Sequence, residues 1–429
     1  MSEAAVKVFQ VELRDLESLL RKRLDFDGLL ECSTESLLPP GDNYGSTILK
    51  VRAVIKRNKP EKNEEEKEEL NLVAKMMPPT DFQRLIFHSS FTFKKETFFY
   101  KKLMPAYQQL EREFGVPADE VFDILPEFYG ARFNLKSGGG HGDGDDDDED
   151  VLVDDDAVIL MQNLKVRGYY MTDRRKGMDL EHARVALKAL ARFHGLGIAM
   201  KHQKPDFFDT MKKRSKCLTI DGVDFEESMA PVLQLFREDP AMSTHQHRLE
   251  AAMRQSSATS WAAVPPEPYS TIIQADFWGN NIMFLKDPDT GRVADVKFVD
   301  FQNYLFMSPL RELVFFLATG LEAPVMNDAE AFDGLIDFYH EHFVKTLARM
   351  KCDPGPFSRE RFDAQLRVDA FEEFPHCPFM LKIMTNEVER DAKSSDIRDR
   401  MMNTRVNELW LERLRRCVAK YAEKGWLGE

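Results

Sequence analysis

The sequence predicts an α+β protein with two lobes, a small β-rich lobe over residues 1–163 and a larger helical lobe over residues 164–429. The chain of 429 residues is long enough to bury more than one hydrophobic core. Apolar runs typical of strands dominate up to about residue 164, whereas apolar residues recur at helical spacing after residue 178. A connector near residues 162–168 separates the two patterns.

The first lobe is predicted to contain strands with one helix between them. Residues 48–55 and 70–75 are strand candidates, and the charged run at 57–69 predicts an exposed hairpin connection between them. Residues 91–113 follow as a helix that is interrupted at Pro105, because proline breaks the helical hydrogen-bond ladder. Residues 157–161 are the last strand expected in this lobe.

The second lobe is predicted to be helical apart from one hairpin. Asp179 is a plausible N-cap for a helix over residues 180–194, and helical spacing dominates again from residue 310 to the end. Residues 282–286 and 294–299 alternate apolar and polar positions on either side of the turn Asp287-Pro-Asp-Thr-Gly291. We therefore expect these two runs to pair as antiparallel strands.

The charge of the chain argues against a nucleic-acid partner. The formal net charge is −14 at pH 7, and nucleic-acid binding requires basic surfaces. Ten acidic residues and no basic residue lie between positions 143 and 156. They belong to a low-complexity insert over residues 137–156, which we expect to be a disordered, solvated surface loop.

The sequence lacks the features of membrane-spanning and secreted proteins. Its longest apolar stretches are too short to cross a bilayer, and its first residues lack the basic-then-apolar pattern of a secretory signal. The five cysteines are odd in number and scattered, which is typical of reduced thiols in a cytosolic protein. We predict a cytoplasmic monomer with no membrane partner.

The predicted hairpin carries the chemistry of the second lobe. Asp276 ends an apolar run, Asn281 follows five residues later, and Asp300 ends the second strand. If the strands pair, Asn281 and Asp300 meet at the open end of the hairpin, with Asp276 in the loop just before it. Two hard oxygen ligands beside a free carboxylate suit a Mg²⁺ ion that carries nucleotide phosphates, which indicates phosphoryl transfer.

A lysine and a glutamate in the first lobe fit the same chemistry. Glu96 lies on the inward face of its predicted helix, because Phe99, Tyr100 and Leu103 follow it at i+3, i+4 and i+7. A buried carboxylate needs a cationic partner, and the preceding strand supplies Lys75. Such a pair holds the lysine of kinase-fold enzymes on the α- and β-phosphates.

These motifs resemble the ecdysteroid kinase-like family, also called CHK kinase-like, within the choline and aminoglycoside phosphotransferase group. The resemblance rests on Asp276-Phe-Trp-Gly-Asn-Asn281, on Val296-Lys-Phe-Val-Asp300-Phe-Gln302 and on Phe93-Lys-Lys-Glu96-Thr-Phe-Phe99-Tyr100. It covers nearly the whole chain from residue 41 to the helices past residue 317. It implies a two-lobed protein-kinase-like fold that uses ATP and Mg²⁺.

The resemblance also implies a role for each motif residue. Asp276 would orient or deprotonate the acceptor hydroxyl, while Asn281 and Asp300 would bind Mg²⁺. The remaining nucleotide contacts would come from Lys75 with Glu96, from the glycine turn and from the connector, namely Gly41, Asn43, Gly45, Ser46, Met161 and Gln162. The implied acceptor is a hydroxyl of a small lipophilic molecule, such as an ecdysteroid-like steroid or a xenobiotic conjugate.

One motif departs from the family pattern. The family usually reads His-Gly-Asp where this chain reads Gln274-Ala275-Asp276. The histidine braces the catalytic loop, and glutamine offers a donor and an acceptor at similar reach, so an active kinase is the favoured reading. The alternative is a catalytically impaired pseudokinase that binds a nucleotide or another ligand as a regulatory protein.

The acceptor side is less defined by sequence. No Ala-Pro-Glu motif follows Asp300 before the helix at residues 310–317, so a small-molecule acceptor is favoured over a protein. Glu312 stands where the family often has Asp, and His194 reads as a core histidine with satisfied hydrogen bonds. The expected acceptor pocket draws on the C-terminal helices, whose large side chains at helical spacing also suit a core: Phe371, Phe374, Phe379, Met380 and Met384.

Overall fold

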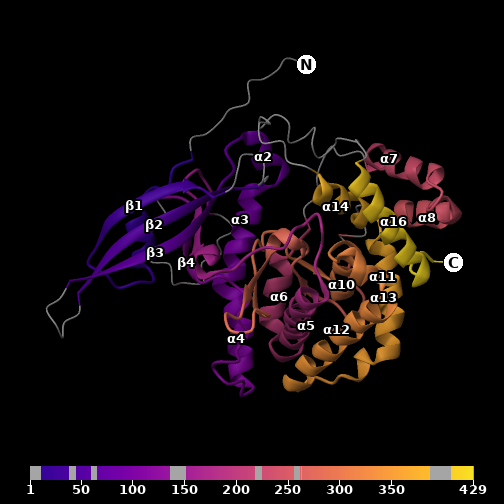
Figure 1. The fold of residues 1–429 in the computed structure, drawn as a ribbon. Coiled ribbons are helices and arrows are strands. Elements are labelled where there is room, and N and C mark those ends of the chain that lie inside the picture. Colours follow the sequence, from indigo (N-terminus) through magenta and orange to yellow (C-terminus); the bar gives the residue numbers. More distant parts are fainter. Residues whose placement is uncertain are drawn as a thin grey trace, which may run out of the picture. The chain divides into compact units, whose positions relative to one another are not determined.

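The computed structural model describes residues 11–37, 45–58, 65–135, 151–217, 225–255, 261, 263–386 and 407–428, and it divides them into two compact units (Figure 1). Unit 1 comprises the described residues before position 102 together with Leu125–Gly168, and unit 2 comprises Lys102–Ile124 and the described residues from Tyr169 onward. The sequence predicts a single boundary after residue 163. In the structure Lys102–Ile124 belong to unit 2, where Arg192 donates hydrogen bonds to the Glu111 carboxylate and to the Glu120 carbonyl.

Unit 1 is built on a five-stranded antiparallel sheet with the order β1-β2-β3-β5-β4. Its strands are β1 (Gly28–Ser36), β2 (Thr47–Asn58), β3 (Glu65–Met76), β4 (Phe128–Arg132) and β5 (Val158–Gln162). One face of the sheet packs with α1 (Leu16–Arg21) into a core that includes Val51, Ala53, Leu72, Ala74 and Leu160. The period-two alternation of β3 therefore places Lys75 on the opposite face.

The hairpin between β2 and β3 extends further than the sequence indicates. Both strands continue into the charged run at 57–69, where Arg57 pairs with Glu68 and Arg52 with Glu69. Cross-strand ion pairs of this kind let charged residues occupy an exposed strand face. The turn itself, residues 59–64, lies outside the described residues.

Helices α2 (Asp81–Ile86) and α3 (Ser89–Phe98) follow β3, and α3 runs through a π-helical segment η1 (Phe99–Leu103) into α4 (Met104–Glu113). The expected interruption at Pro105 is this π-helical turn, which ends just before the proline. Pro105 occupies the first turn of α4, where its missing N–H is tolerated.

The structure describes only the last part of the predicted acidic insert at residues 137–156. Residues 136–150 lie outside the described residues, and for residues 151–156 the expectation of a disordered loop is wrong. Asn134 Nδ2 donates to the Leu152 carbonyl at 2.7 Å, Arg132 Nε donates to the Asp156 carbonyl at 2.9 Å, and Arg84 pairs with Asp155. Arginines on neighbouring elements thus hold this acidic stretch against the sheet.

Unit 2 is helical around the long helix α5 (Leu180–Gln203). Asp179 caps α5 as predicted, because its carboxylate accepts the His182 N–H at 2.9 Å. The helix runs well past residue 194, and within it Gly195 and Gly197 admit close neighbours, the Thr346 and Thr271 side chains. The other α-helices are α6 (Pro205–Arg214), α7 (Phe225–Glu238), α8 (Gln246–Gln255), α10 (Pro309–Thr319), α11 (Ala323–Asn327), α12 (Ala329–Arg349), α13 (Arg359–Glu373), α14 (His376–Thr385) and α16 (Glu408–Glu423).

Two short strand pairs complete unit 2. The predicted hairpin is present, with β7 (Ile282–Lys286) antiparallel to β8 (Val293–Phe298). A second pair, β6 (Thr271–Ile273) with β9 (Leu305–Met307), was not predicted, since strands of three residues carry almost no periodic signal. Short 3₁₀ turns lie in unit 2 at η4 (Ser243–His245), η5 (Gly279–Asn281) and η6 (Gly355–Phe357), and in unit 1 at η3 (Leu164–Arg167).

The predicted α+β class is confirmed by a β-rich unit 1 and a helical unit 2. Among the helices that the structure describes, none combines the length and the apolar character needed for crossing a membrane. The five cysteines, all of which the structure describes, form no disulfide, and three of them, Cys352, Cys377 and Cys417, are buried.

Candidate active site

The β7–β8 hairpin brings the predicted metal ligands together in unit 2. Asn281 precedes β7, and its backbone carbonyl accepts the Val299 N–H at 3.0 Å, so Asp300 follows directly on the partner strand. The Asn281 side-chain amide donates to the Asp276 carbonyl at 2.9 Å and to Asp276 Oδ2 at 2.8 Å. The strand register therefore gathers all three residues at the open end of the hairpin.

The backbone at this site is strained at two positions. Ala275 and Asp300 adopt left-handed conformations, with φ of 63° and 62°. A residue with a Cβ atom avoids this region at a cost of about 1–2 kcal/mol, and such strain persists only where the surroundings hold it. Ala275, which stands where the family motif usually has glycine, therefore takes a conformation that glycine would adopt at less cost.

Gln274 ties the loop before Asp276 to the strand before Asp300. Its side chain is fully buried, and Nε2 donates to the Val299 carbonyl at 2.7 Å. Its Oε1 is also buried and has no hydrogen-bond partner within the described part of the chain. The amide orientation follows from the carbonyl that Nε2 must meet. This contact is of the kind that a bracing role for Gln274 requires.

Glu312 on α10 holds the backbone of the same loop. Its carboxylate accepts the Ala275 N–H at 2.6 Å and the Gln274 N–H at 3.2 Å. His194 Nε2 lies 2.8 Å from the same carboxylate, and His194 Nδ1 lies 2.7 Å from the Tyr339 hydroxyl. His194 is thus the satisfied core histidine that the sequence predicts, whereas the sequence analysis missed Tyr339 because one tyrosine on a long amphipathic helix carries no distinguishing signal.

Unit 1 contains the predicted lysine–glutamate pair. Lys75 Nζ lies 2.5 Å from Glu96 Oε2, and both side chains are almost fully buried, at 4% and 1% exposure. Lys75 is on β3, with Ile48 of β2 and Ile159 of β5 as its cross-strand neighbours. A lysine on the third strand paired with a glutamate on the following helix is the arrangement of protein-kinase small lobes.

The other predicted nucleotide contacts are only partly described. Gly41 and Asn43 lie outside the described residues, while Gly45 and Ser46 lead directly into β2. Met161 and Gln162 end β5 between β3 and β4, and the Gln162 N–H donates to the Glu127 carbonyl at 2.8 Å. That N–H is engaged within the sheet, so the adenine contact expected at Gln162 would have to use its other groups.

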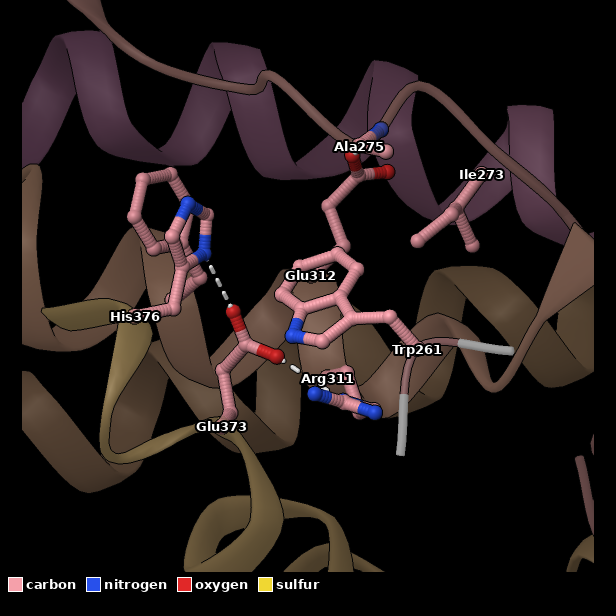
Figure 2. A pocket seen from close by; sticks show the side chains of 8 residues that line it. Trp261, Ile273, Ala275, Arg311, Glu312, Glu373 and His376 are labelled. Atoms are coloured by element: carbon pink, nitrogen blue, oxygen red, sulfur yellow. Dashed lines mark hydrogen bonds and ion pairs between the residues drawn. The ribbon is translucent and has the colours of Figure 1, made fainter. Parts of the chain in front are cut away.

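A small pocket in unit 2 lies against Ala275, one residue before Asp276 (Figure 2). Its volume is about 10 Å³, enough for one water molecule. The rings of Trp261 and His376 meet edge to face at 5.0 Å, and His376 stacks on Phe315 at 4.5 Å. The lining residues are Trp261, Ile273, Ala275, Arg311, Glu312, Phe315, Glu373 and His376.

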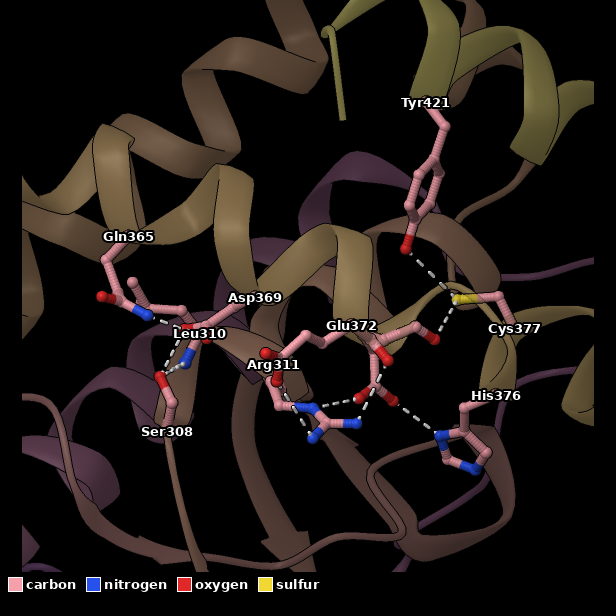
Figure 3. Close-up of polar contacts among 10 residues, drawn as sticks. Ser308, Leu310, Arg311, Gln365, Asp369, Glu372, His376, Cys377 and Tyr421 are labelled. Atoms are coloured by element: carbon pink, nitrogen blue, oxygen red, sulfur yellow. Dashed lines mark hydrogen bonds and ion pairs between the residues drawn. The ribbon is translucent and has the colours of Figure 1, made fainter. Parts of the chain in front are cut away.

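Three side chains in the wall of this pocket, Arg311, Glu373 and His376, are paired with one another. Glu373 accepts from Arg311 Nε at 2.8 Å and from His376 Nδ1 at 2.7 Å (Figure 2). In a separate group of hydrogen bonds nearby, Asp369 accepts from Ser308 and, at 3.0 Å, from Gln365 (Figure 3). Burial raises the pKa of Asp369 to about 7, although these hydrogen bonds act in the opposite direction.

The residues expected to form the acceptor pocket do not line this one. Phe374 and Met384 are buried at 0% and 2% exposure and belong to the core, while Phe379 is 43% exposed. Their helical spacing reflects packing between α13, α14 and α16, where Phe374 meets the Tyr421 ring at 5.0 Å. The structure therefore supports a core role for Phe374, Met380 and Met384, but not for Phe379.

The donor set at the hairpin fits Mg²⁺. Asn281 and Asp300 offer an amide oxygen and a carboxylate, both hard ligands, and no sulfur or imidazole ligand accompanies them in the predicted set. Because Asn281 Nδ2 faces Asp276, its carbonyl oxygen is the atom left for a cation. The described residues contain no group of three His, Cys, Asp or Glu side chains suited to a metal ion. Mg²⁺ does not require one, since it takes one or two protein ligands together with phosphates and water.

Three solved structures resemble the chain at low sequence identity. An ethanolamine kinase from Plasmodium vivax is 9% identical, with 87% of this chain and 81% of that chain covered and a TM-score of 0.38. A spectinomycin phosphotransferase in complex with ADP and spectinomycin is 9% identical, with 91% and 93% covered and a TM-score of 0.42. The GDP complex of wild-type aminoglycoside 2′-phosphotransferase-IIIa is 11% identical, with 95% and 97% covered and a TM-score of 0.37.

A comparison with curated proteins gives no significant match. The model of the ecdysteroid kinase-like family matches residues 40–352, which include the Lys75–Glu96 pair, the Asp276 loop and the β7–β8 hairpin. This match covers well over half of the chain and confirms the resemblance found in the sequence. The chain belongs to the ecdysteroid kinase-like family.

Proposed function

We propose that this protein transfers the γ-phosphoryl group of ATP, as its Mg²⁺ complex, to a hydroxyl of a small lipophilic molecule. The observation that carries the proposal is the convergence of Asp276, Asn281 and Asp300 at one end of the β7–β8 hairpin. A carboxylate beside two hard oxygen ligands is what phosphoryl transfer requires, because the reaction depends on positioning and charge stabilisation.

Each residue of the hairpin would have a separate task. Asp276 would accept the proton of the acceptor hydroxyl as its oxygen bonds to the γ-phosphorus and the bond to the departing ADP oxygen breaks. Asn281 and Asp300 would hold the metal ion, and the Asn281 amide would keep the Asp276 carboxylate aimed. When bound, Mg²⁺ would neutralise charge on the β- and γ-phosphates.

Unit 1 would supply the nucleotide contacts. Lys75, held by Glu96, would meet the α- and β-phosphates, and the turn containing Gly45 and Ser46, with Gly41 and Asn43 before it, would offer backbone N–H groups. Met161 and Gln162 would contact the adenine. A buried lysine–glutamate pair is weak evidence for stability, so a functional reason for its presence is the better supported one.

The pocket beside Ala275 supports a neutral, largely apolar acceptor such as an ecdysteroid-like steroid or a xenobiotic alcohol. Its two carboxylates, Glu312 and Glu373, already accept hydrogen bonds from protein donors, so the acceptor positions that a cationic substrate would need are engaged. The aromatic rings of Trp261 and Phe315 favour an apolar ring. A volume of about 10 Å³ means that these side chains must move apart to admit it.

The test is transfer of labelled phosphate from Mg·ATP to a panel of steroid and phenolic alcohols, with Asp276→Ala as the control. We expect a labelled product that the control does not form. The pseudokinase alternative arises because this chain has Gln274-Ala275 where the family usually has His-Gly. Wild-type turnover equal to that of the control, with thermal stabilisation by nucleotide retained, would favour that alternative. We also propose that the enzyme is monomeric and cytoplasmic.

A further inference from the structure

The loop before Asp276 is held in an unfavourable backbone conformation by contacts outside the loop. Ala275 has a φ of 63°, and the residue carries a Cβ atom that this conformation penalises. Its N–H and the N–H of Gln274 both point at one carboxylate, that of Glu312, at 2.6 and 3.2 Å. Successive N–H groups around a left-handed residue form a concave anion site, which Glu312 fills.

Glu312 is itself positioned by a second pair of buried groups. Its carboxylate side chain is 1% exposed and lies 2.8 Å from His194 Nε2, while His194 Nδ1 lies 2.7 Å from the Tyr339 hydroxyl. Burial raises the pKa of Tyr339 well above its usual value of 10, so the phenol keeps its proton. Both hydrogen bonds of His194 are satisfied when the Tyr339 hydroxyl donates to His194 Nδ1 and the N–H at His194 Nε2 donates to Glu312.

We infer that Tyr339, His194 and Glu312 form a positioning relay whose task is to hold Ala275 in its left-handed conformation and so to aim Asp276. The relay joins α12, α5 and α10 to the loop through hydrogen bonds of 3.2 Å or less, all of them buried except the partly buried bond to the Ala275 N–H. Tyr339 and His194 do not line the pocket beside Ala275, and no described contact joins any of the three relay side chains to Asn281 or Asp300. They are positioning residues, and their catalytic consequence rests on the proposed function.

The first test is hydrogen exchange in the protein without ligands, read on peptides that contain the Gln274 and Ala275 amides. Tyr339→Phe removes one hydroxyl and should raise exchange at these amides roughly tenfold, because the Glu312 acceptor loses its fixed position. Tyr421→Phe is the matched control, since Tyr421 is equally buried in unit 2 and its hydroxyl contacts Cys377 Sγ at 3.5 Å. The control should leave exchange at Gln274 and Ala275 unchanged.

The second test is rescue. Ala275→Gly removes the conformational penalty that the relay offsets, so the double variant Tyr339→Phe with Ala275→Gly should regain wild-type protection within about threefold. A purely global weakening of unit 2 would not be reversed by a change at residue 275. If Tyr339→Phe fails to fold, Glu312→Gln takes its place, because its amide retains one acceptor oxygen and should expose one of the two N–H groups.

The catalytic readout separates this inference from the proposed function. On an alcohol that the transfer panel identifies, Tyr339→Phe should lower kcat roughly tenfold and leave KM for Mg·ATP within twofold. Faster exchange in Tyr339→Phe with rescue by Ala275→Gly, in a protein that transfers no phosphate, would keep the relay and reject the kinase. Unchanged exchange in Tyr339→Phe, equal changes in the Tyr421→Phe control, or no rescue would overturn the relay.

Discussion

The side-chain amide of Asn281 donates to both the backbone carbonyl and the carboxylate of Asp276, at 2.9 and 2.8 Å. Asn281 thus holds the Asp276 carboxylate in place, while its own side-chain carbonyl oxygen remains available for a metal ion. The two aspartates of the site have different neighbours. Asp276 accepts a hydrogen bond from Asn281, whereas Asp300 follows Val299, whose carbonyl accepts from Gln274. This division predicts different consequences for the two aspartates.

Asp276→Asn should abolish phosphate transfer and spare Mg·ATP binding, because the new amide oxygen can still accept from Asn281 while it no longer takes a proton. Asp300→Asn should instead weaken the thermal stabilisation given by Mg·ATP, since it removes the charged metal ligand. Transfer assays and melting curves with and without Mg·ATP measure the two effects. Asp289→Asn, an exposed aspartate in the same hairpin, is the control, and equal loss of nucleotide stabilisation in both site variants would contradict the division.

Glu96→Gln should destabilise the protein by about 3–5 kcal/mol, because it leaves the buried Lys75 charge uncompensated. Replacing both partners, Lys75→Met with Glu96→Leu, should restore most of that stability and abolish stabilisation by Mg·ATP. Urea unfolding and nucleotide-dependent melting separate the two results.

A matched control for this pair lies in the same unit. Lys50 and Glu35 are also 2.5 Å apart but are 41% and 65% exposed, so Glu35→Gln should cost less than about 1 kcal/mol. A double variant that still gains stability from Mg·ATP would show that the buried pair has no part in nucleotide binding.

Gln274→Ala should lower turnover by one to two orders of magnitude, about 1.4–2.8 kcal/mol of barrier, because the Val299 carbonyl loses its donor next to Asp300. Gln274→His should keep or raise turnover, since an imidazole N–H can meet the same carbonyl and the buried Oε1 of glutamine, which has no partner among the described residues, is removed. Steady-state kinetics on an active acceptor provide the measurement. The hypothesis of a bracing role would fail if the alanine and histidine variants had the same kcat.

Asp369 should make stability depend on pH. Its pKa is raised by burial to about 7 in the folded protein, well above the value near 3.9 of an unfolded aspartate. The folded state therefore binds the proton more tightly, and its stabilising contribution is fully present below pH 4 and is lost as the pH rises through 7. Asp369→Asn removes this loss, so its stability relative to wild type should increase between pH 5 and pH 8 by roughly 2–4 kcal/mol.

Urea unfolding at both pH values provides the measurement for Asp369. Asp209→Asn, at an exposed position on α6, should show no such pH-dependent difference from wild type. A constant difference between Asp369→Asn and wild type across this range would mean that Asp369 is ionised in the folded protein throughout.

The sequence by itself determined the local features of the molecule. The β7–β8 hairpin follows from period-two alternation around a Pro-Asp-Thr-Gly turn, and the Asp179 cap and the inward face of Glu96 follow from helical spacing. The Lys75–Glu96 ion pair could also be predicted from the sequence, because an unpaired buried carboxylate is costly and the preceding strand provides a cation. Family membership rested on the same local motifs.

Only the tertiary structure decided which distant residues hold the loop. Glu312 lies 37 residues from Ala275, His194 lies 118 residues from Glu312, and Tyr339 lies 145 residues from His194. The β6–β9 pair and the place of α4 in unit 2 were likewise decided by packing. The physical reason is that periodicity and capping describe neighbours along one element, whereas a buried hydrogen bond between elements depends on how their faces meet.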